Sequence, residues 1–441
     1  MGYRSSIAYL YGLQHYGIKF GLTSISKLLA ALGNPHHHFR SVHIAGTNGK
    51  GSTAAFIASI AAAAGYKTGL YTSPHLISFT ERIKINNREI SRASVVRLTG
   101  LIRDAASPLD SITFFEFVTA MAFTFFAEQK VECAVVETGM GGRLDATNVL
   151  QPILSIITNV SRDHELYLGN TLPKIANEKA GIIKRNGVLL TAARNSAVLK
   201  LFRERCRKKR SALLVLGKDF NLQRRPDNTL TYRGMAHDIH QLHLGLRGEH
   251  QLDNGALALA AVELLGRSGF AITDTSMRRG LKDVVWPGRL ETAGSRPQVI
   301  FDGAHNPAAM KCLRNSILNG FDYDRLMLVL GIMHDKDIRT MLKEIVPIAS
   351  KVFLCRPRMD RAASTAELAR RLRNSGVCYL ETQSVGEALQ RALQEARRRD
   401  LVCITGSLFT VGEAQAAFKR LTAADASAGQ VSRIRNWGKQ I

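Results

Sequence analysis

Cysteine is scarce in this chain of 441 residues, and its six cysteines are scattered without a single CxxC pair. This spacing excludes a zinc ribbon and a disulfide-stapled scaffold, which need closely spaced or numerous cysteines. Cys133, Cys355 and Cys403 lie in short apolar runs that are typical of strands. We therefore expect them to be small core residues of a protein from a reducing compartment.

Long apolar runs are also missing. No stretch of 18 apolar residues occurs, so no membrane-spanning helix is expected. The N-terminus lacks the pattern of a secretory signal peptide, so we predict a cytoplasmic protein with no membrane among its partners. An apolar content of 45% and a charged content of 22% are those of a soluble globular protein, and the length predicts two or three domains.

Acidic residues are few, because 36 Asp and Glu stand against 60 Lys and Arg, a formal net charge of +24. Such an excess occurs in nucleic-acid-binding proteins, and it also attracts anionic small molecules or simply makes the surface basic. The basic clusters lie at the ends of expected helices without interleaved aromatic residues: 208–210, 370–371 and 397–399. We favour a solvated basic surface and expect small-molecule partners, not nucleic acid.

The most informative stretch runs from Ser41 to Thr53 and reads SVHIAGTNGKGST. Its apolar start predicts a buried parallel strand, and the alanine-rich residues 54–64 predict a helix. Glycines between a strand and a helix let backbone N–H groups approach phosphates, and the helix N-terminus adds a favourable dipole. We predict a polyphosphate site in which Lys50 contacts the phosphates and Ser52 or Thr53 faces Mg²⁺. The common GxxxxGK[ST] spacing is not met, because Ile44 occupies the position of its first glycine.

Strand and helix patterns alternate through the first half of the chain, which predicts a doubly wound parallel sheet. Further strands are expected at 68–71, 131–137, 153–158, 188–191 and 213–216. Helices are expected at 115–126, 173–183 and 197–208. Short alternating runs over 218–246 predict a small antiparallel sheet at the edge of this domain, before a long helix over 254–267.

A second series of strands and helices begins near Pro297 and predicts a separate Rossmann-like unit. Its strands are expected at 299–302, 326–330, 352–355, 377–380 and 402–405. We thus predict an α/β protein: a P-loop doubly wound parallel sheet domain with a small antiparallel edge sheet over 1–296, followed by a second Rossmann-like α/β domain over 297–441.

Polar side chains follow three strands of the first domain at the point where each strand ends. Glu137 closes one strand, Ser73 follows another, and His164 follows a third. In an open α/β sheet, ligands bind at the carboxyl ends of the strands, and carboxylate oxygen suits Mg²⁺. The sequence therefore predicts a metal–phosphate site where these residues meet the glycine-rich loop.

Three further positions are expected to serve this site. Lys179 lies on an apolar helical face, where a lysine is costly unless it is paired or modified. Arg289, just before the expected domain boundary, is placed to reach a γ-phosphate. Residues 302–307, Asp-Gly-Ala-His-Asn-Pro, end the first strand of the second domain and direct polar groups to the gap between the domains.

Together these motifs resemble the folylpolyglutamate synthase/dihydrofolate synthase family of the Mur ligase superfamily. The matching segments follow one another from about residue 20 to 413: 43–52, 72–76 with 81–82, 114–117, 137–148, 158–159, 163–164, 168–169, 175–176, 178–182, 247–251 with Asn254, 286–289, 302–307, 406–408 and 412–413. The ordered set is highly specific, although each motif alone is only moderately so.

The resemblance implies an ATP-dependent ligase that phosphorylates a pterin-linked carboxylate and transfers the acyl group to L-glutamate. It implies two Mg²⁺ ions, a monovalent cation and a carbamylated Lys179, with Lys50, Lys179 and His305 as catalytic residues. Implied ATP contacts are Asn48, Gly49, Lys50, Gly51, Ser52, Asn254, Arg289 and Asp302. Implied metal ligands are Ser73 and Glu137 for one ion, and Glu137 with His164 for the other.

The resemblance also places the two other substrates. The implied pterin surface comprises Gly21, Leu22, Thr113, Leu144, Asp145 and Ala146. Arg82 and Ser407, with His305, are the implied neighbourhood of the incoming glutamate. Domain closure would exclude water from the acyl phosphate, and a monomer is expected.

Several functions stay open at this point. The first is a ligase that makes dihydrofolate from dihydropteroate and then adds further glutamates, and the runner-up performs only one of these reactions. A peptidoglycan-precursor ligase is a third possibility, although only about 40 residues precede the phosphate loop. The net charge leaves a nucleic-acid-binding P-loop protein as a fourth, which would bind oligonucleotides in a salt-dependent way.

Overall fold

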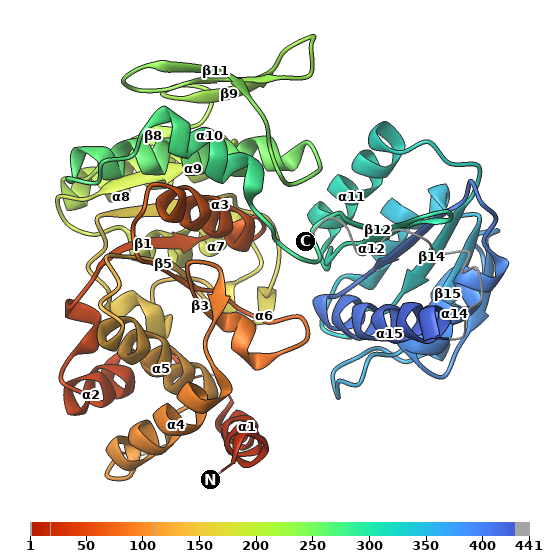
Figure 1. Cartoon of the computed structure of the whole chain (residues 1–441), viewed down its shortest axis with the longest axis horizontal. Coiled ribbons are helices and arrows are strands. Elements are labelled where there is room, and N and C mark those ends of the chain that lie inside the picture. Colours follow the sequence, from red (N-terminus) through yellow and green to blue (C-terminus); the bar gives the residue numbers. More distant parts are fainter. Residues whose placement is uncertain (1, 18, 110, 428–441) are drawn as a thin grey trace. The chain divides into compact units, whose positions relative to one another are not determined.

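The computed structural model describes residues 2–17, 19–109 and 111–427, with the side chains of 424–427 left out. The chain divides into two compact units, residues 1–245 with 250–285 and residues 246–249 with 286–441 (Figure 1). No helix within these described ranges combines the length and the apolarity needed to cross a membrane. Cys133, Cys355 and Cys403 are buried, as predicted.

An eight-stranded sheet in the order β4-β3-β2-β5-β1-β6-β7-β8 is the framework of the first unit. Its strands are β1 (Arg40–Ala45), β2 (Thr68–Tyr71), β3 (Ile83–Ile85), β4 (Arg88–Glu89), β5 (Cys133–Glu137), β6 (Leu154–Ile157), β7 (Val188–Thr191) and β8 (Ala212–Val215). The six strands from β2 to β8 in this order are parallel, and the predicted doubly wound sheet is confirmed. The β3–β4 hairpin at the edge was not predicted.

Helices cover both faces of this sheet (Figure 1). On one face α3 (Lys50–Ala63) packs against α9 (His250–Arg267) and α10 (Asp274–Asp283). The contact is close, because a Cβ on Gly280 of α10 would lie 2.4 Å from the Cα of Ile60. On the other face α1 (Tyr3–Gly12), α2 (Thr23–Ala31), α4 (Arg92–Ala106) and α5 (Phe114–Glu128) form one apolar cluster with alternate residues of β5. The helices α6 (Glu165–Leu168), α7 (Leu172–Lys179) and α8 (Ser196–Lys209) follow β6 and β7.

The predicted small antiparallel sheet is present, with β9 (Asn221–Arg224), β10 (Leu230–Arg233) and β11 (Asp238–Leu242) in the order β11-β10-β9. It is a sheet of its own and does not extend the eight-stranded one. The buried hydroxyl of Tyr232 on β10 donates a 2.9 Å hydrogen bond to Glu263 of α9, which attaches this small sheet to the unit.

The second unit contains a six-stranded sheet in the order β12-β13-β17-β14-β15-β16. Its strands are β12 (Glu291–Ser295), β13 (Gln298–Phe301), β14 (Leu326–Leu330), β15 (Lys351–Leu354), β16 (Cys378–Glu381) and β17 (Leu401–Thr405). Its helices are α11 (Pro307–Gly320), α12 (Ile338–Ile345), α13 (Thr365–Leu372), α14 (Val385–Glu395) and α15 (Leu408–Ser427). The five predicted strands are parallel and confirm the Rossmann-like expectation.

The boundary between the units differs from the predicted one at 296/297. Residues 291–295, which the predicted boundary assigns to the first domain, form β12, which pairs antiparallel with β13 through Ala293 and Val299. This pairing holds the segment in the second unit, which begins at Trp286 after Val285 of the first. The strand has few apolar residues, so its pairing partner, and not its own pattern, makes it a strand.

Candidate active site

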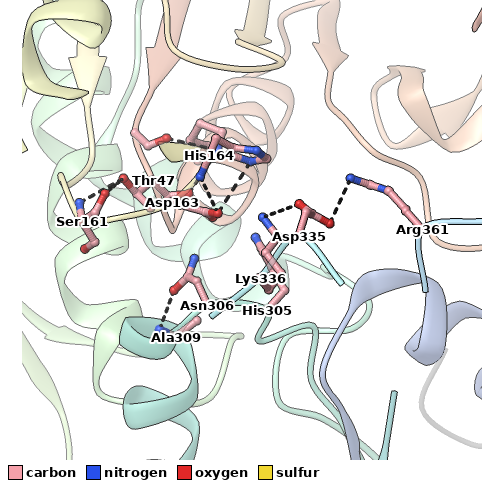
Figure 2. Close-up of polar contacts among 12 residues, drawn as sticks. Thr47, Ser161, Asp163, His164, His305, Asn306, Ala309, Asp335, Lys336 and Arg361 are labelled. Carbon is pink, nitrogen blue, oxygen red and sulfur yellow. Dashed lines mark hydrogen bonds and ion pairs between the residues drawn. The ribbon is translucent and has the colours of Figure 1, made fainter. Parts of the chain in front are cut away.

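The loop between β1 and α3 is braced by the segment that follows β6. The Thr47 amide donates to the Asn159 carbonyl at 3.0 Å, and the Asn48 amide donates to Asn159 Oδ1 at 2.9 Å. Thr47 and Ser161 exchange two hydrogen bonds of 3.1 and 3.0 Å, which Figure 2 shows. The phosphate loop is therefore fixed by protein contacts alone.

Gly49 ends this loop in a conformation that only glycine adopts freely, with φ of 83°. A Cβ here would lie 2.3 Å from Oδ1 of Asn254, so α9 approaches the loop backbone directly. Asn254 is held in turn, because its Nδ2 donates to Gln251 at 2.8 Å and its Oδ1 accepts from Thr53 at 3.4 Å. Gln251 also donates to Oγ of the buried Ser52 at 3.5 Å.

Substituting Gly49 by alanine is expected to raise KM for ATP at least tenfold, because the new methyl group displaces Asn254 and strains the loop. Initial rates of ADP formation at varied ATP measure this effect. Gly100→Ala is the matched control, since a Cβ on Gly100 of α4 meets no atom within 4 Å. An unchanged KM for ATP in Gly49→Ala would contradict the predicted binding of phosphates by this loop.

Lys50 begins α3 and lies between the loop and Glu137. Its Nζ donates to the carbonyls of Gly46 and Thr47, both at 3.2 Å, and lies 3.8 Å from Glu137 Oε1. Because β1 and β5 are neighbours in the sheet, this cation and this carboxylate meet at the carboxyl edge, as the order of the strands requires.

The three predicted metal ligands follow three nearby strands. The Ser73 amide, after β2, donates to Glu137 Oε2 at 3.3 Å, so these two residues are in contact. His164 follows β6, with Nε2 4.0 Å from Asp163 Oδ1 (Figure 2). Within the described ranges no group of three or more His, Cys, Asp and Glu side chains is placed to hold a metal ion. Glu137 and Ser73 offer oxygen ligands of the kind that Mg²⁺ prefers, and Mg²⁺ usually keeps water and phosphate oxygens as further ligands.

Lys179, the last residue of α7, is only 2% exposed. Its Nζ donates to the Gly46 carbonyl at 2.9 Å, so it reaches the same loop as Lys50 from another helix. Burial, reinforced by the nearby charge of Lys50, lowers the pKa of Lys179 to about 7. A substantial fraction of the amine is therefore neutral and nucleophilic near neutral pH.

Asp145, one of the predicted pterin residues, lies inside the loop after Glu137. Its carboxylate accepts from the amides of Met140 and Thr147 at 2.9 and 3.0 Å, and from the Thr147 hydroxyl at 2.5 Å. The buried His43 contacts the same hydroxyl through Nε2 at 2.8 Å. Asp145 thus orders the loop that follows Glu137, in which Leu144 and Ala146 are its neighbours.

The remaining predicted residues of the first unit lie around α2 and α5. Gly21 and Leu22 precede α2, and Leu22 packs on the apolar cluster of the N-terminal helices. Thr113 caps α5, and both its amide and its hydroxyl donate to Glu116, at 2.9 and 2.8 Å. Arg82, at the end of a 3₁₀ turn (Phe79–Arg82), is only 7% exposed.

In the second unit the predicted residues gather at the carboxyl ends of the neighbouring strands β13 and β17. Asp302 accepts from the amides of Leu290 and Ala304, both at 2.9 Å, and Arg289 donates to the Gly288 carbonyl at 3.0 Å. His305 Nδ1 lies 2.8 Å from the Gly303 carbonyl, and Ser407 accepts from the Thr410 amide at 3.0 Å. Asn306 caps α11 by accepting from Ala309 at 2.9 Å (Figure 2).

One charged group at this edge was missed. Asp335 lies 3.7 Å from Lys336 Nζ and 3.9 Å from Arg361 Nη1, as Figure 2 shows. Residues 334–337 read His-Asp-Lys-Asp soon after the predicted strand at 326–330. A charged run just beyond the carboxyl end of a strand is the same signal that singled out Glu137, so it could have been found.

A phosphate loop that carries Lys50 beside Glu137, and a second parallel sheet with polar loops at its carboxyl edge, define the class of Mur-type ligases. The model of the Mur ligase middle domain matches residues 44–262, and that of the Mur ligase glutamate ligase domain matches residues 288–408. The resemblance found in the sequence is thereby confirmed.

Comparison with known proteins identifies a narrower family within this class. The chain is 33% identical over 428 residues to the dihydrofolate synthase/folylpolyglutamate synthase of Bacillus subtilis, covering 95% of this chain and 99% of that one. The chain belongs to the dihydrofolate synthase/folylpolyglutamate synthase family of Mur ligases.

Two further comparisons add to this. A crystal structure of the bifunctional enzyme of Yersinia pestis, complexed with AMPPNP and a Mn ion, aligns with a TM-score of 0.85 and 28% identity over 95% of this chain and 98% of that one. The chain is 38% identical over 438 residues to a probable bifunctional folylpolyglutamate synthase/dihydropteroate synthase of Halobacterium salinarum. That match includes 95% of this chain but spans only 52% of the longer relative.

Proposed function

We propose that this protein uses ATP to join L-glutamate to the carboxylate of dihydropteroate, of a reduced folate, or of both, through an acyl phosphate. The contact of Lys50 with Glu137 at the phosphate loop is the observation that supports it most directly. The folate ligases among its relatives give the substrate class.

The reaction proceeds in two steps. A carboxylate oxygen of the acceptor attacks the γ-phosphorus of ATP, and the bond from that phosphorus to the β,γ-bridging oxygen breaks and releases ADP. The glutamate amine then attacks the acyl carbon, loses a proton, and expels inorganic phosphate from the tetrahedral intermediate.

The chain's residues stabilise the charge that moves in these steps. We assign to Lys50 the neutralisation of the transferred phosphoryl oxygens, and to the phosphate loop the supply of backbone N–H donors. Mg²⁺ ions, held by Ser73 and Glu137 and by Glu137 with His164, would add positive charge on the phosphates when bound. Asn48, Gly51, Ser52, Asn254, Arg289 and Asp302 are the remaining proposed ATP contacts, and His305, Ser407 and Arg82 the proposed glutamate residues.

We further assign a carbamate to Lys179. A buried amine with a lowered pKa can attack CO₂, forming an N–C bond and releasing one proton, which leaves a carboxylate-like group. The carbamate keeps an N–H that can still donate to the Gly46 carbonyl. It would replace a costly buried cation by an anion suited to a metal site. A monovalent cation, a monomeric state and a cytoplasmic location without nucleic acid complete the proposal.

The test is ADP formation by the purified full chain with ATP, L-glutamate and one acceptor at a time. We expect dihydropteroate, a reduced folate monoglutamate, or both to stimulate ADP formation. Stimulation by both acceptors indicates two activities, and stimulation by one indicates a single activity. If neither acceptor stimulates ADP formation while a muramyl nucleotide does, the folate assignment is wrong.

A further inference from the structure

Arg82 carries a buried charge that is near Glu137 and Glu81 but is not in direct contact with a carboxylate among the described residues. It is 7% exposed, and among the described residues it forms no ion pair and only one hydrogen bond, from Nε to His75 Nδ1 at 2.8 Å. Its guanidinium also lies over the ring of Phe114, 5.2 Å from the centroid. Neither Nη group makes a hydrogen bond among the described residues, so the guanidinium can still bind a ligand that accepts from a bidentate donor.

The bond from Arg82 determines the tautomer of His75. Arginine only donates, so Nδ1 of His75 must accept and carries no proton. With Nδ1 accepting from Arg82, the ring is neutral and its single proton is on Nε2. Nε2 lies 3.1 Å from the hydroxyl of Tyr11, which therefore accepts from it.

This direction leaves the proton of the Tyr11 hydroxyl available. Burial raises the pKa of Tyr11, so the hydroxyl stays protonated. Tyr11, on α1, stacks on Phe114 with centroids 5.8 Å apart and an interplanar angle of 19°, and the residue is 39% exposed. Arg82, His75 and Tyr11 are thus linked by two consecutive hydrogen bonds. The Nη groups of Arg82 at one end and the hydroxyl of Tyr11 at the other end can still donate.

We propose that His75 is a positioning residue that holds Arg82 for a substrate carboxylate, and that Tyr11 donates its free proton to the same ligand. The inference rests on the proposed function, whose acceptor and amino-acid substrates both carry carboxylates. The pterin-linked acceptor and L-glutamate are the two sources of this chemistry, and the experiment separates them.

The test compares His75→Leu, His75→Asn and Tyr11→Phe with the unmodified protein. Leucine removes the acceptor for Arg82, whereas asparagine keeps an acceptor near the position of Nδ1. We expect His75→Leu to raise KM for one carboxylate substrate about 10- to 50-fold, with KM for ATP changed less than twofold, and His75→Asn to restore most of the loss. Tyr11→Phe should raise the same KM about fivefold. The substrate whose KM rises is the ligand of Arg82.

Tyr9→Phe, on the same helix, is the matched control and should leave every KM unchanged. Calorimetric binding of dihydropteroate and of L-glutamate without ATP tests the inference apart from turnover. The inference is overturned if the wild-type protein is active and its His75→Leu variant has unchanged KM values for both carboxylate substrates. That outcome leaves the proposed function standing. An equal rise in all three KM values, or no rescue by asparagine in a folded variant, also overturns it. Wild-type protein that binds both carboxylates but forms no ADP contradicts only the proposed function.

Discussion

A Lys50→Met variant is expected to lose about three orders of magnitude in kcat for glutamate-dependent ADP formation, the scale on which removing one donor to a transition-state oxyanion acts. Methionine keeps the length of the side chain and removes its charge. In the structure the ammonium lies 3.8 Å from Glu137 and donates to two carbonyls of the phosphate loop. Loss of the charge removes one cation from the proposed phosphate site.

Initial rates at saturating ATP, acceptor and glutamate measure this loss. Lys200→Met, an exposed lysine on α8, is the control for the removal of one positive charge from this basic protein and should behave as wild type. A Lys50→Met enzyme within tenfold of the wild-type kcat would show that the loop binds something other than the reacting phosphates.

Lys179→Ala is the second large effect, with an expected loss of at least 100-fold in kcat, comparable with the removal of a preorganised group at a phosphoryl-transfer site. If the lysine acts as a carbamate, formate or acetate should restore part of the activity by placing a carboxylate in the space left by the side chain. The wild-type protein in ¹³C-labelled bicarbonate should also show a carbamate resonance that the variant lacks.

Lys174→Ala, an exposed lysine on the same helix, is the matched control and should keep full activity. Full activity of Lys179→Ala would exclude any role for this lysine in the reaction. An inactive variant that no carboxylate rescues, together with a wild-type spectrum without the carbamate resonance, would assign the role to the free amine instead.

The phosphate loop could be predicted from the sequence because its signal is local. Strand, glycines, lysine and helix follow one another within Ser41–Thr53, and the structure reproduces them. The parallel strands after it were found for the same reason, since fully buried parallel strands are short apolar runs. Even α4, which was not predicted, carried a local signal in the spacing of Val95, Leu98 and Ile102.

Other features depend on contacts between distant residues. The hydrogen bond from Lys179 to Gly46 joins residues 133 positions apart, and that between His75 and Tyr11 joins residues 64 apart. No spacing rule reports such a pair, so the sequence could place Lys179 on a helix but could not identify the group that it contacts. The strand β12 was missed for a related reason, because its partner β13 supplies the hydrogen bonds that make it extended.

The bracing of the phosphate loop by Asn159 and Ser161 has a consequence for the energetics of binding. Each residue that is fixed in one backbone conformation loses about 1–2 kcal/mol of conformational free energy. Because Thr47 and Asn48 are already held by the segment after β6, this entropy is lost when the chain folds and not when the nucleotide arrives. Less of the binding free energy between the loop and the phosphates is then spent on ordering the loop. Nucleotide binding should therefore change the rate of amide hydrogen exchange in this loop only slightly.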